Sequence, residues 1–235
     1  MTLDEVMKEL AGKARESQKR TLLRHGAKEP LFGVRIGDLT PLRKRLKGRQ
    51  DLALELYATG NSDAMYLAGL IADGSKMSAK ELDRWANDAT WHMIAGCSVP
   101  WVAAEHPEAW EIASKWTESR KELVATAGWS TWASLVCVRP DAELPLADVE
   151  AALARVVRTI HAAPNRVRYA MNSFVICCGT YVAPLAARAI ETSRSMGRVE
   201  VDMGDTDCRV PDAESYILRS RRGASVAPKR KTTRC

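Results

Sequence analysis

Apolar residues recur at helical spacing along most of the chain. Thr2 and Glu5 form a capping-box pattern before the first such run, and Ser78 and Glu81 form another. Helices are therefore expected at residues 3–14, 40–47, 51–58, 63–72, 79–85, 107–117, 123–138, 146–161, 166–178, 184–193 and 212–219. Alternation of apolar and polar residues, which indicates a strand, is nearly absent. The pattern predicts an all-α protein.

Two segments interrupt this pattern. Residues 24–42 are punctuated by glycine and proline, so an irregular connection is expected there before a short basic helix. Residues 199–210 alternate briefly and contain a Gly-Asp pair, which favours a short extended excursion over a helix. Both segments are therefore expected to lie outside the regular helical framework.

The expected helices follow one another in consecutive pairs, which limits the architecture to a bundle or a stacked solenoid. Short antiparallel pairs favour the solenoid, and they recur at about the 40 to 47 residues typical of HEAT-type repeats. We therefore expect a HEAT-like repeat α-solenoid. Such a stack of helical pairs has a concave groove.

Two segments stand out as core candidates. Residues 123–138 contain no charge and no proline, so they are expected to form a buried helix that acts as the spine of the core. Residues 85–105 hold Trp85, Trp91 and Trp101 beside His92. Because tryptophan is large and amphipathic, this second segment is expected to wall either a core or a ligand groove.

Charge is distributed unevenly along the chain, whose net charge is +6. Residues 13–49 hold twelve Lys or Arg against three acidic residues, and residues 219–235 hold seven basic residues and no acid. Such clusters are typical of nucleic-acid binding, although they also occur on merely solvated surfaces. We expect one domain at residues 1–218 and, from its Gly, Ser, Ala, Pro and basic content, a disordered tail at residues 219–235.

Several classes of protein are not indicated. The chain has no apolar run of membrane-spanning length, and Met1–Glu5 lacks the features of a signal peptide, so a cytoplasmic protein without membrane contact is expected. The six cysteines have no zinc spacing, and Asp202, Asp205 and Asp207 do not match a calcium loop. Nucleotide-binding and hydrolase motifs are also absent from the sequence. We expect no metal and no cofactor.

The helical-repeat order, the motifs FGVRIGDLTPLRKRL and GNSDAMYLAGLIAD, and the Trp-rich segment together resemble the AlkD-like DNA alkylation repair proteins. The resemblance covers about residues 20 to 195. It implies HEAT-like repeats that hold duplex DNA in a basic concave groove. It also implies an activity, because active members excise positively charged alkylated purines as DNA N-glycosylases.

The resemblance also indicates candidate catalytic positions. Active members carry a Trp followed one turn later by an Asp, a few residues before a Pro. Matching that Pro to Pro100 places Trp91 or His92 at the aromatic position and Ala95 or Gly96 at the acidic position, so the carboxylate is missing. Catalysis is then lost or redesigned. The candidate catalytic residues, with carboxylates that would replace the missing one in space, are Trp91, His92, Asp83, Asp88 and Glu105.

The candidate binding residues are basic or aromatic. Those expected to meet nucleic acid are Arg43, Lys44, Arg45, Lys47, Arg166, Arg168 and Asn172. Those expected to be groove aromatics are Trp85, Trp91, Trp101, Trp129 and Tyr181. The resulting hypothesis is a DNA alkylation repair-like protein that binds duplex DNA and recognises or excises alkylated bases. The alternative is a non-catalytic HEAT-type scaffold that binds a protein partner through an apolar rather than a basic groove.

Overall fold

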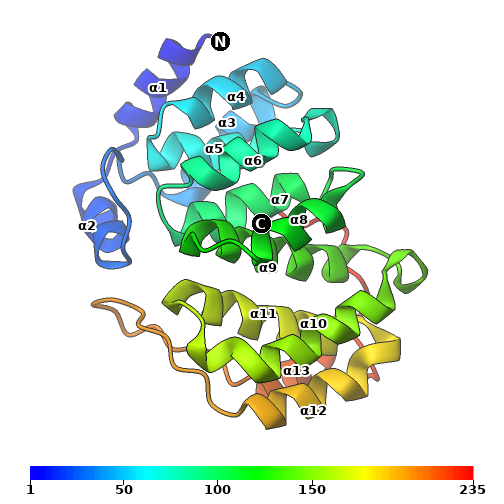
Figure 1. The fold of residues 1–235 in the computed structure, drawn as a ribbon. Coiled ribbons are helices and arrows are strands. Elements are labelled where there is room, and N and C mark those ends of the chain that lie inside the picture. Colours follow the sequence, from blue (N-terminus) through cyan, green and yellow to red (C-terminus); the bar gives the residue numbers. More distant parts are fainter. Residues whose placement is uncertain (235) are drawn as a thin grey trace.

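The computed structural model describes residues 1–234, in which every regular element is helical (Figure 1). The α-helices are α1 (Leu3–Gly12), α2 (Glu16–Arg24), α3 (Ile36–Arg45), α4 (Gln50–Ala58), α5 (Ser62–Ile71), α6 (Ala79–Asp88), α7 (Val99–Ala103), α8 (Ala109–Thr117), α9 (Glu122–Val138), α10 (Leu146–Thr159), α11 (Asn165–Tyr181), α12 (Ala186–Met196) and α13 (Ala213–Arg221). The all-α prediction is confirmed, and both predicted capping boxes are present.

The N-terminal helices differ from the prediction in their bounds. α1 ends at Gly12, and α2 is a separate helix that the periodicity did not indicate, because none of its residues is fully buried. α3 begins at Ile36 and contains Pro41. An interior proline removes one backbone hydrogen bond and crowds the carbonyl four residues earlier, yet the helix extends across Pro41 and begins before the start near Thr40 that the sequence suggested.

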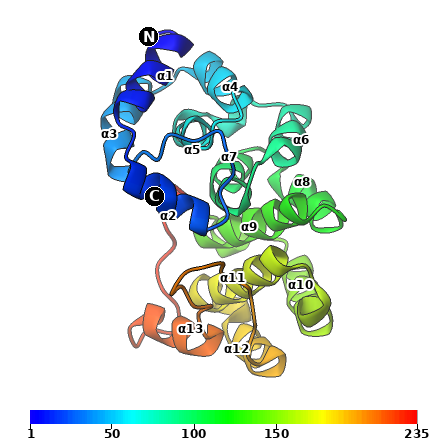
Figure 2. The ribbon, with the colours of Figure 1, turned by 90° about the vertical axis from the view of Figure 1, so that its left-hand side faces the viewer.

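The helices stack in pairs as a solenoid (Figures 1 and 2). α5, α7, α9, α11 and α13 pack one after another, and α4, α6, α8, α10 and α12 lie beside them as the other members of the pairs. No single helix within residues 1–234 is long and apolar enough to cross a membrane, although α11 and α12, which are bent by 112°, reach that length and composition as a pair.

α9 connects the two hydrophobic cores of the solenoid. Val124 and Ala127 on this helix belong to the core built from α1 to α8, whereas Trp129 and Trp132 belong to the core built from α10 to α13. Gly128 allows α8 to lie against it, because a Cβ at this position would come within 2.6 Å of the Thr117 backbone nitrogen. The prediction that residues 123–138 form a buried spine is confirmed.

The two motifs that carry the family resemblance are in direct contact. The buried carboxylate of Asp63, at the start of α5, accepts hydrogen bonds from the backbone N–H groups of Phe32, Gly33 and Val34 at 2.6 to 3.0 Å. Asn61 caps the same helix. A carboxylate near a helix N-terminus is favoured by the helix dipole, and here it also fixes the connection between α2 and α3.

Residues 224–234, which we call the strap, return from α13 across the solenoid. Along the strap, Ala227 N–H donates to Thr180 O of α11, Arg230 N–H donates to Cys137 O of α9, and the Thr233 hydroxyl donates to Trp101 O of α7. The Arg234 guanidinium donates to Gly69 O and Ala72 O at the end of α5. The red segment behind the inner helices in Figure 1 follows this path.

The expected tail therefore differs from the structure in two ways. α13 continues to Arg221, across the expected boundary at residue 218. The segment beyond it is not a free tail, because its backbone and side chains bond to the ends of four helices. Its composition suggested disorder only because it contains too little apolar surface to fold alone.

Candidate nucleic-acid interface

A hollow of about 380 Å³, which we call the central groove, lies between the inner helices α7, α9 and α11. α9 and α11 each contribute one stripe of residues with hydroxyl groups. On α9 the stripe includes Thr126, Ser130 and Ser134, and on α11 it includes Tyr169 and Ser173. Since successive positions in each stripe are four residues apart, each set lies on one helical face. The groove floor therefore combines hydroxyl groups with apolar surface.

The wall formed by the Trp-rich segment contains a π-helical turn, Ile94–Ser98, immediately before α7. Pro100 has no N–H, so it cannot donate to the Gly96 carbonyl. The Val99 N–H donates to Ile94 O, five residues earlier, which is the hydrogen bond of a π-helix. Turns of this kind recur at functional sites. Here the turn places Gly96 and Cys97 on the groove.

Thiol groups lie at the opposite end of the groove from His92. Cys137 of α9 and Cys177 of α11 line the groove beside Arg230 of the strap, and their thiols are hydrogen bonded to each other. That hydrogen bond is the main cause that lowers the pKa of Cys177. Cys137, Cys177, Cys178 and Cys208 are not joined in disulfide bonds.

His92 lines the end of the groove near the start of α11. Desolvation lowers its pKa from the ordinary 6.5 to about 4, and repulsion from Arg166 and His25 adds to this shift. The imidazole is therefore neutral at neutral pH, so it is an acceptor or a single donor rather than a cation.

We expect the stability of the protein to fall between pH 6.5 and pH 4 partly because of His92. The unfolded chain binds the proton near pH 6.5 and the folded chain only near pH 4, so the contribution of the neutral ring is complete above pH 6.5 and is lost as the pH falls. Urea unfolding of wild type and His92→Gln across this range should show a shallower pH dependence in the variant. An NMR titration midpoint of His92 close to 6.5 would contradict this expectation.

The predicted groove aromatics are mostly core residues. Trp85 stacks on Tyr57 with ring centroids 3.9 Å apart, and Trp129 packs against Phe174 in the second core. Trp91 is buried, and its indole N–H has no hydrogen-bond partner within residues 1–234. Of the five, only Trp101 lines the central groove, where it packs edge-on against Tyr66.

Tyr181 lies at the end of α11, half-buried and outside the residues that line the central groove. Its pKa is raised by burial. The Trp-rich pattern did not distinguish core from groove, because both environments bury most of an indole ring.

The candidate carboxylates lie away from the central groove. Asp83 accepts from the Trp116 indole N–H at 2.7 Å and pairs with Lys115, Asp88 is exposed at the end of α6, and Glu105 pairs with Arg234 of the strap. Within residues 1–234, no Asp or Glu side chain lines the groove. None of the three therefore replaces the carboxylate that the family pattern would place near Gly96.

The predicted cations fall into separate groups. Arg43 and Lys44 of α3 line a second hollow of about 1040 Å³, together with Lys47 just beyond the end of the helix and with Lys76 and Arg139. We call this the basic hollow. Arg45, on the same helix, pairs with Glu9 of α1 and is not among the residues that line it. The structure therefore does not bring Arg45 together with the other three predicted cations of residues 43–47, because a helix distributes consecutive residues around its axis.

Arg166 and Arg168 lie at the other end of the inner helices. Arg166 lines the central groove, and its backbone N–H donates to Glu122 at the start of α9. Because α9 has 17 residues, this end of the helix is about 25 Å from the basic hollow at its other end. The cations therefore border the groove at both ends.

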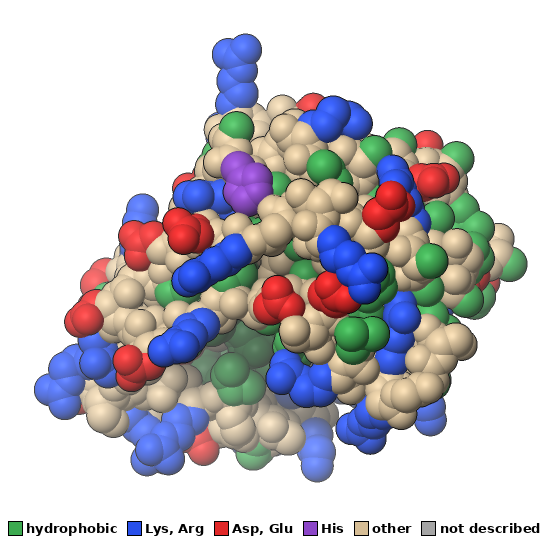
Figure 3. Space-filling model, turned by 90° about the horizontal axis from the view of Figure 1, so that it is seen from below, with side chains coloured by type: hydrophobic (Ala, Val, Ile, Leu, Met, Phe, Trp, Pro, Cys, Tyr) green, Lys and Arg blue, Asp and Glu red, His purple; other side chains and the backbone are tan. Residues whose placement is uncertain are grey.

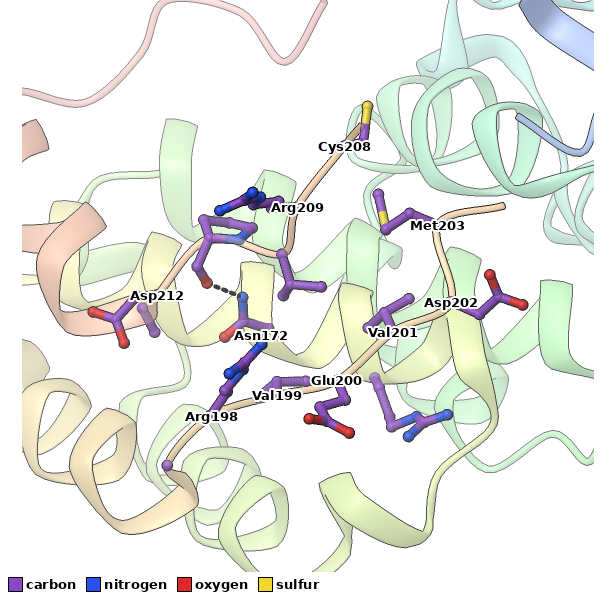
Figure 4. Close-up of a pocket in the computed structure, with 15 residues that line it drawn as sticks. Asn172, Arg198, Val199, Glu200, Val201, Asp202, Met203, Cys208, Arg209 and Asp212 are labelled. Atoms are coloured by element: carbon purple, nitrogen blue, oxygen red, sulfur yellow. Dashed lines mark hydrogen bonds between the residues drawn. The ribbon is translucent and has the colours of Figure 1, made fainter. Parts of the chain in front are cut away.

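Arg168 and Asn172 line a third hollow, of about 920 Å³, beneath the loop of residues 197–212 (Figure 4). The Asn172 amide donates to Pro211 O at 3.0 Å and is almost fully buried. Asn172 is therefore a residue that holds the loop rather than a nucleic-acid contact. The loop has no strand, in agreement with an irregular excursion outside the helical framework.

Figure 3 shows the end of the solenoid that α12 and α13 form. Lys and Arg side chains stand along its left and lower edges, around a hollow with a partly hydrophobic floor, and acidic side chains are interspersed. Basic and acidic side chains are thus mixed over this face, and basic ones border the hollow.

Sequence reasoning missed the thiols, the hydroxyl stripes and the strap. The stripes had a signal in the sequence, because residues with hydroxyl groups recur at helical spacing within otherwise apolar helices. The strap had none, since its contacts are to backbone carbonyl groups far away in the sequence.

The comparisons with known proteins agree with this architecture. The model of the DNA alkylation repair enzyme family matches residues 6–202, and the chain therefore belongs to that family. It is 33% identical to the Listeria innocua protein Lin0241 and 31% identical to the Listeria monocytogenes protein Lmo0209, over 94% of this chain and 98% of each relative. Both relatives carry the description uncharacterized.

A solved structure is also similar, with a TM-score of 0.91 and 36% sequence identity over 100% of both chains. It is described as one of a new family of proteins related to the HEAT-like repeat DNA glycosylases, with affinity for branched DNA structures. The predicted HEAT-like solenoid is confirmed by this likeness.

Proposed function

We propose that this protein binds DNA through its central groove and the cations at both ends of that groove, that it prefers branched over linear duplex DNA, and that it does not excise alkylated bases. The observation that carries the proposal is the placement of Arg166 and of the basic hollow at opposite ends of α9. Two basic regions about 25 Å apart suit two separate segments of phosphate backbone. The affinity of the solved relative for branched DNA supports the same choice of ligand.

The groove floor favours contact with unstacked bases at a branch. Tyr169 provides exposed aromatic surface there, beside the largely buried Trp101, and the hydroxyl groups of Ser130 and Ser134 provide donors and acceptors. Unpaired bases stack on aromatic side chains and bond through their exposed edges. A linear duplex would present only its backbone to this floor, so the floor supplies the preference and the cations supply the general affinity.

The proposal is tested by measuring affinity for a four-way junction, a three-way junction and a linear duplex with equal numbers of nucleotides. We expect fluorescence anisotropy at 50 mM NaCl to show junctions bound at least about tenfold more tightly than the duplex, since base contacts add to the shared phosphate term. The scaffold alternative makes a different prediction, because a protein partner would bind through the apolar floor with little salt dependence.

Two outcomes would contradict the proposal separately. Equal affinity for junctions and linear duplex would remove the preference for branches while leaving DNA binding. No binding of any of these DNAs at 50 mM NaCl would remove DNA binding itself.

A further inference from the structure

The strap lies on the C-terminal ends of the inner helices. The carbonyl groups that it contacts belong to the last turns of α11, α9, α7 and α5. The last four carbonyl groups of a helix have no partner within the helix, and together they carry a partial negative charge. Glu105 and Asp141 lie at the same ends. Without the strap, these carbonyl groups and the two carboxylates would be left without the cations of the strap, and their negative charge would oppose a phosphate backbone there.

The four cations of the strap have two different roles. Lys229 and Arg234 point inward, because Lys229 bonds to Val136 O and pairs with Asp141, and Arg234 is nearly buried in its pair with Glu105. Arg230 and Lys231 are exposed, and neither forms an ion pair within residues 1–234. The inward pair neutralises the helix ends, and the outward pair leaves net positive charge on the surface.

The strap also lies between the central groove and the basic hollow, which are the two hollows proposed to bind DNA. Arg230 and Thr233 line the central groove on one side, and Thr232 and Arg234 line the basic hollow on the other. A DNA backbone that passes from the groove to the cations of α3 must therefore cross the strap. The outward cations lie on that route.

We propose that the strap is part of the nucleic-acid-binding surface, where it covers four electronegative helix ends and presents Arg230 and Lys231 to the phosphates of the bound DNA. This inference rests on the proposed function. The alternative is a strap that acts as a plug and keeps DNA out of the groove. A plug would have to dissociate from the helix ends before DNA binds. The bonds to four helices and the buried Arg234 favour a strap that stays in place.

The test compares wild type with Arg230→Ala/Lys231→Ala on the four-way junction and the linear duplex. Loss of two phosphate contacts lowers the slope of log affinity against log salt by about 1.8, so the variant should lose about tenfold less affinity than wild type between 50 and 200 mM NaCl. Its melting temperature should stay unchanged, because both side chains are exposed. The matched control is Lys8→Ala/Lys80→Ala, which removes two exposed cations from α1 and α6, outside both hollows, and should behave as wild type.

A second variant, Lys229→Ala/Arg234→Ala, releases the strap while keeping its outward cations. Trypsin should cut at residues 230–231 in this variant much faster than in wild type, as measured by mass spectrometry. Affinity for both DNAs should fall because the helix ends are exposed.

Tighter binding by the released variant would show a plug and overturn the inference. Unchanged salt dependence in Arg230→Ala/Lys231→Ala would also overturn it, while wild-type binding to junctions would leave the proposed function intact. If wild type binds no DNA, both fail.

Discussion

Purified protein should release no methylated purine from alkylated duplex DNA above the spontaneous rate. The sugar cation that forms as a glycosidic bond breaks needs a nearby negative charge, and no carboxylate lines the central groove within residues 1–234. Such an electrostatic partner is worth about 3 to 4 kcal/mol, or two to three decades in rate. Neutral His92 cannot supply it. Single-turnover assays of base release, with an active member of the family as the positive control, measure this directly.

Gly96→Asp is the sharpest companion variant. A Cβ at Gly96 would meet only Ser130 Oγ at 3.7 Å and Thr126 Cγ2 at 4.0 Å, so a carboxylate fits there and faces the groove. We expect this variant to fold and to release methylated purine measurably faster than wild type. Ala95→Asp is the matched control, because Ala95 is fully buried and an unpaired carboxylate there would destabilise the fold. Wild-type release that Asp88→Asn or Asp83→Asn abolishes would show that the assignment of lost catalysis is wrong.

Neutralising the cations of the basic hollow should weaken DNA binding strongly. If Arg43, Lys44, Lys47 and Arg166, together with Arg230 and Lys231 of the strap, each meet a phosphate, wild-type affinity for duplex DNA should fall about 1800-fold between 50 and 200 mM NaCl. Arg43→Gln/Lys44→Gln/Lys47→Gln should reduce the salt slope by about 2.7, which makes that fall about 40-fold smaller. Anisotropy titrations at four salt concentrations give both slopes.

The chain provides its own control for this experiment. Arg45 lies on the same helix but pairs with Glu9, so Arg45→Gln removes the same kind of charge away from the hollow. We expect its salt slope to equal that of wild type. A slope that falls equally in Arg45→Gln, or a triple variant that binds like wild type, would show that α3 is not a phosphate-contact helix.

Local sequence signals were sufficient for most of the fold. The capping boxes at Thr2 and Ser78, the uncharged run of α9 and the pairing of helices each have a short-range cause that a pattern can record. Conversely, α2 was missed because it buries no residue completely. The site was less predictable, because burial of a Trp does not reveal which surface it joins.

The position of a residue around its helix determined whether several of the candidate residues line a hollow. Lys44 and Arg45 are adjacent in sequence, yet Lys44 lines the basic hollow and Arg45 pairs with Glu9. Asn172 shows a further difficulty, since the Pro211 carbonyl that it bonds lies 39 residues away. Interactions over such distances depend on the tertiary arrangement and leave no periodic trace in the sequence.

The strap sets the order in which the binding surface can be completed during synthesis. The Arg234 guanidinium bonds to Gly69 O across 165 residues of chain, so α5 leaves the ribosome long before its last partner exists. Repeats can stack as they emerge, at about 5 to 20 residues per second. The strap, however, is made after all of these helices, and the ends of α5, α7 and α9 keep their free carbonyl groups until then. A nascent chain therefore has a folded solenoid before it has a finished groove edge, and truncation near residue 222 would preserve this immature state permanently.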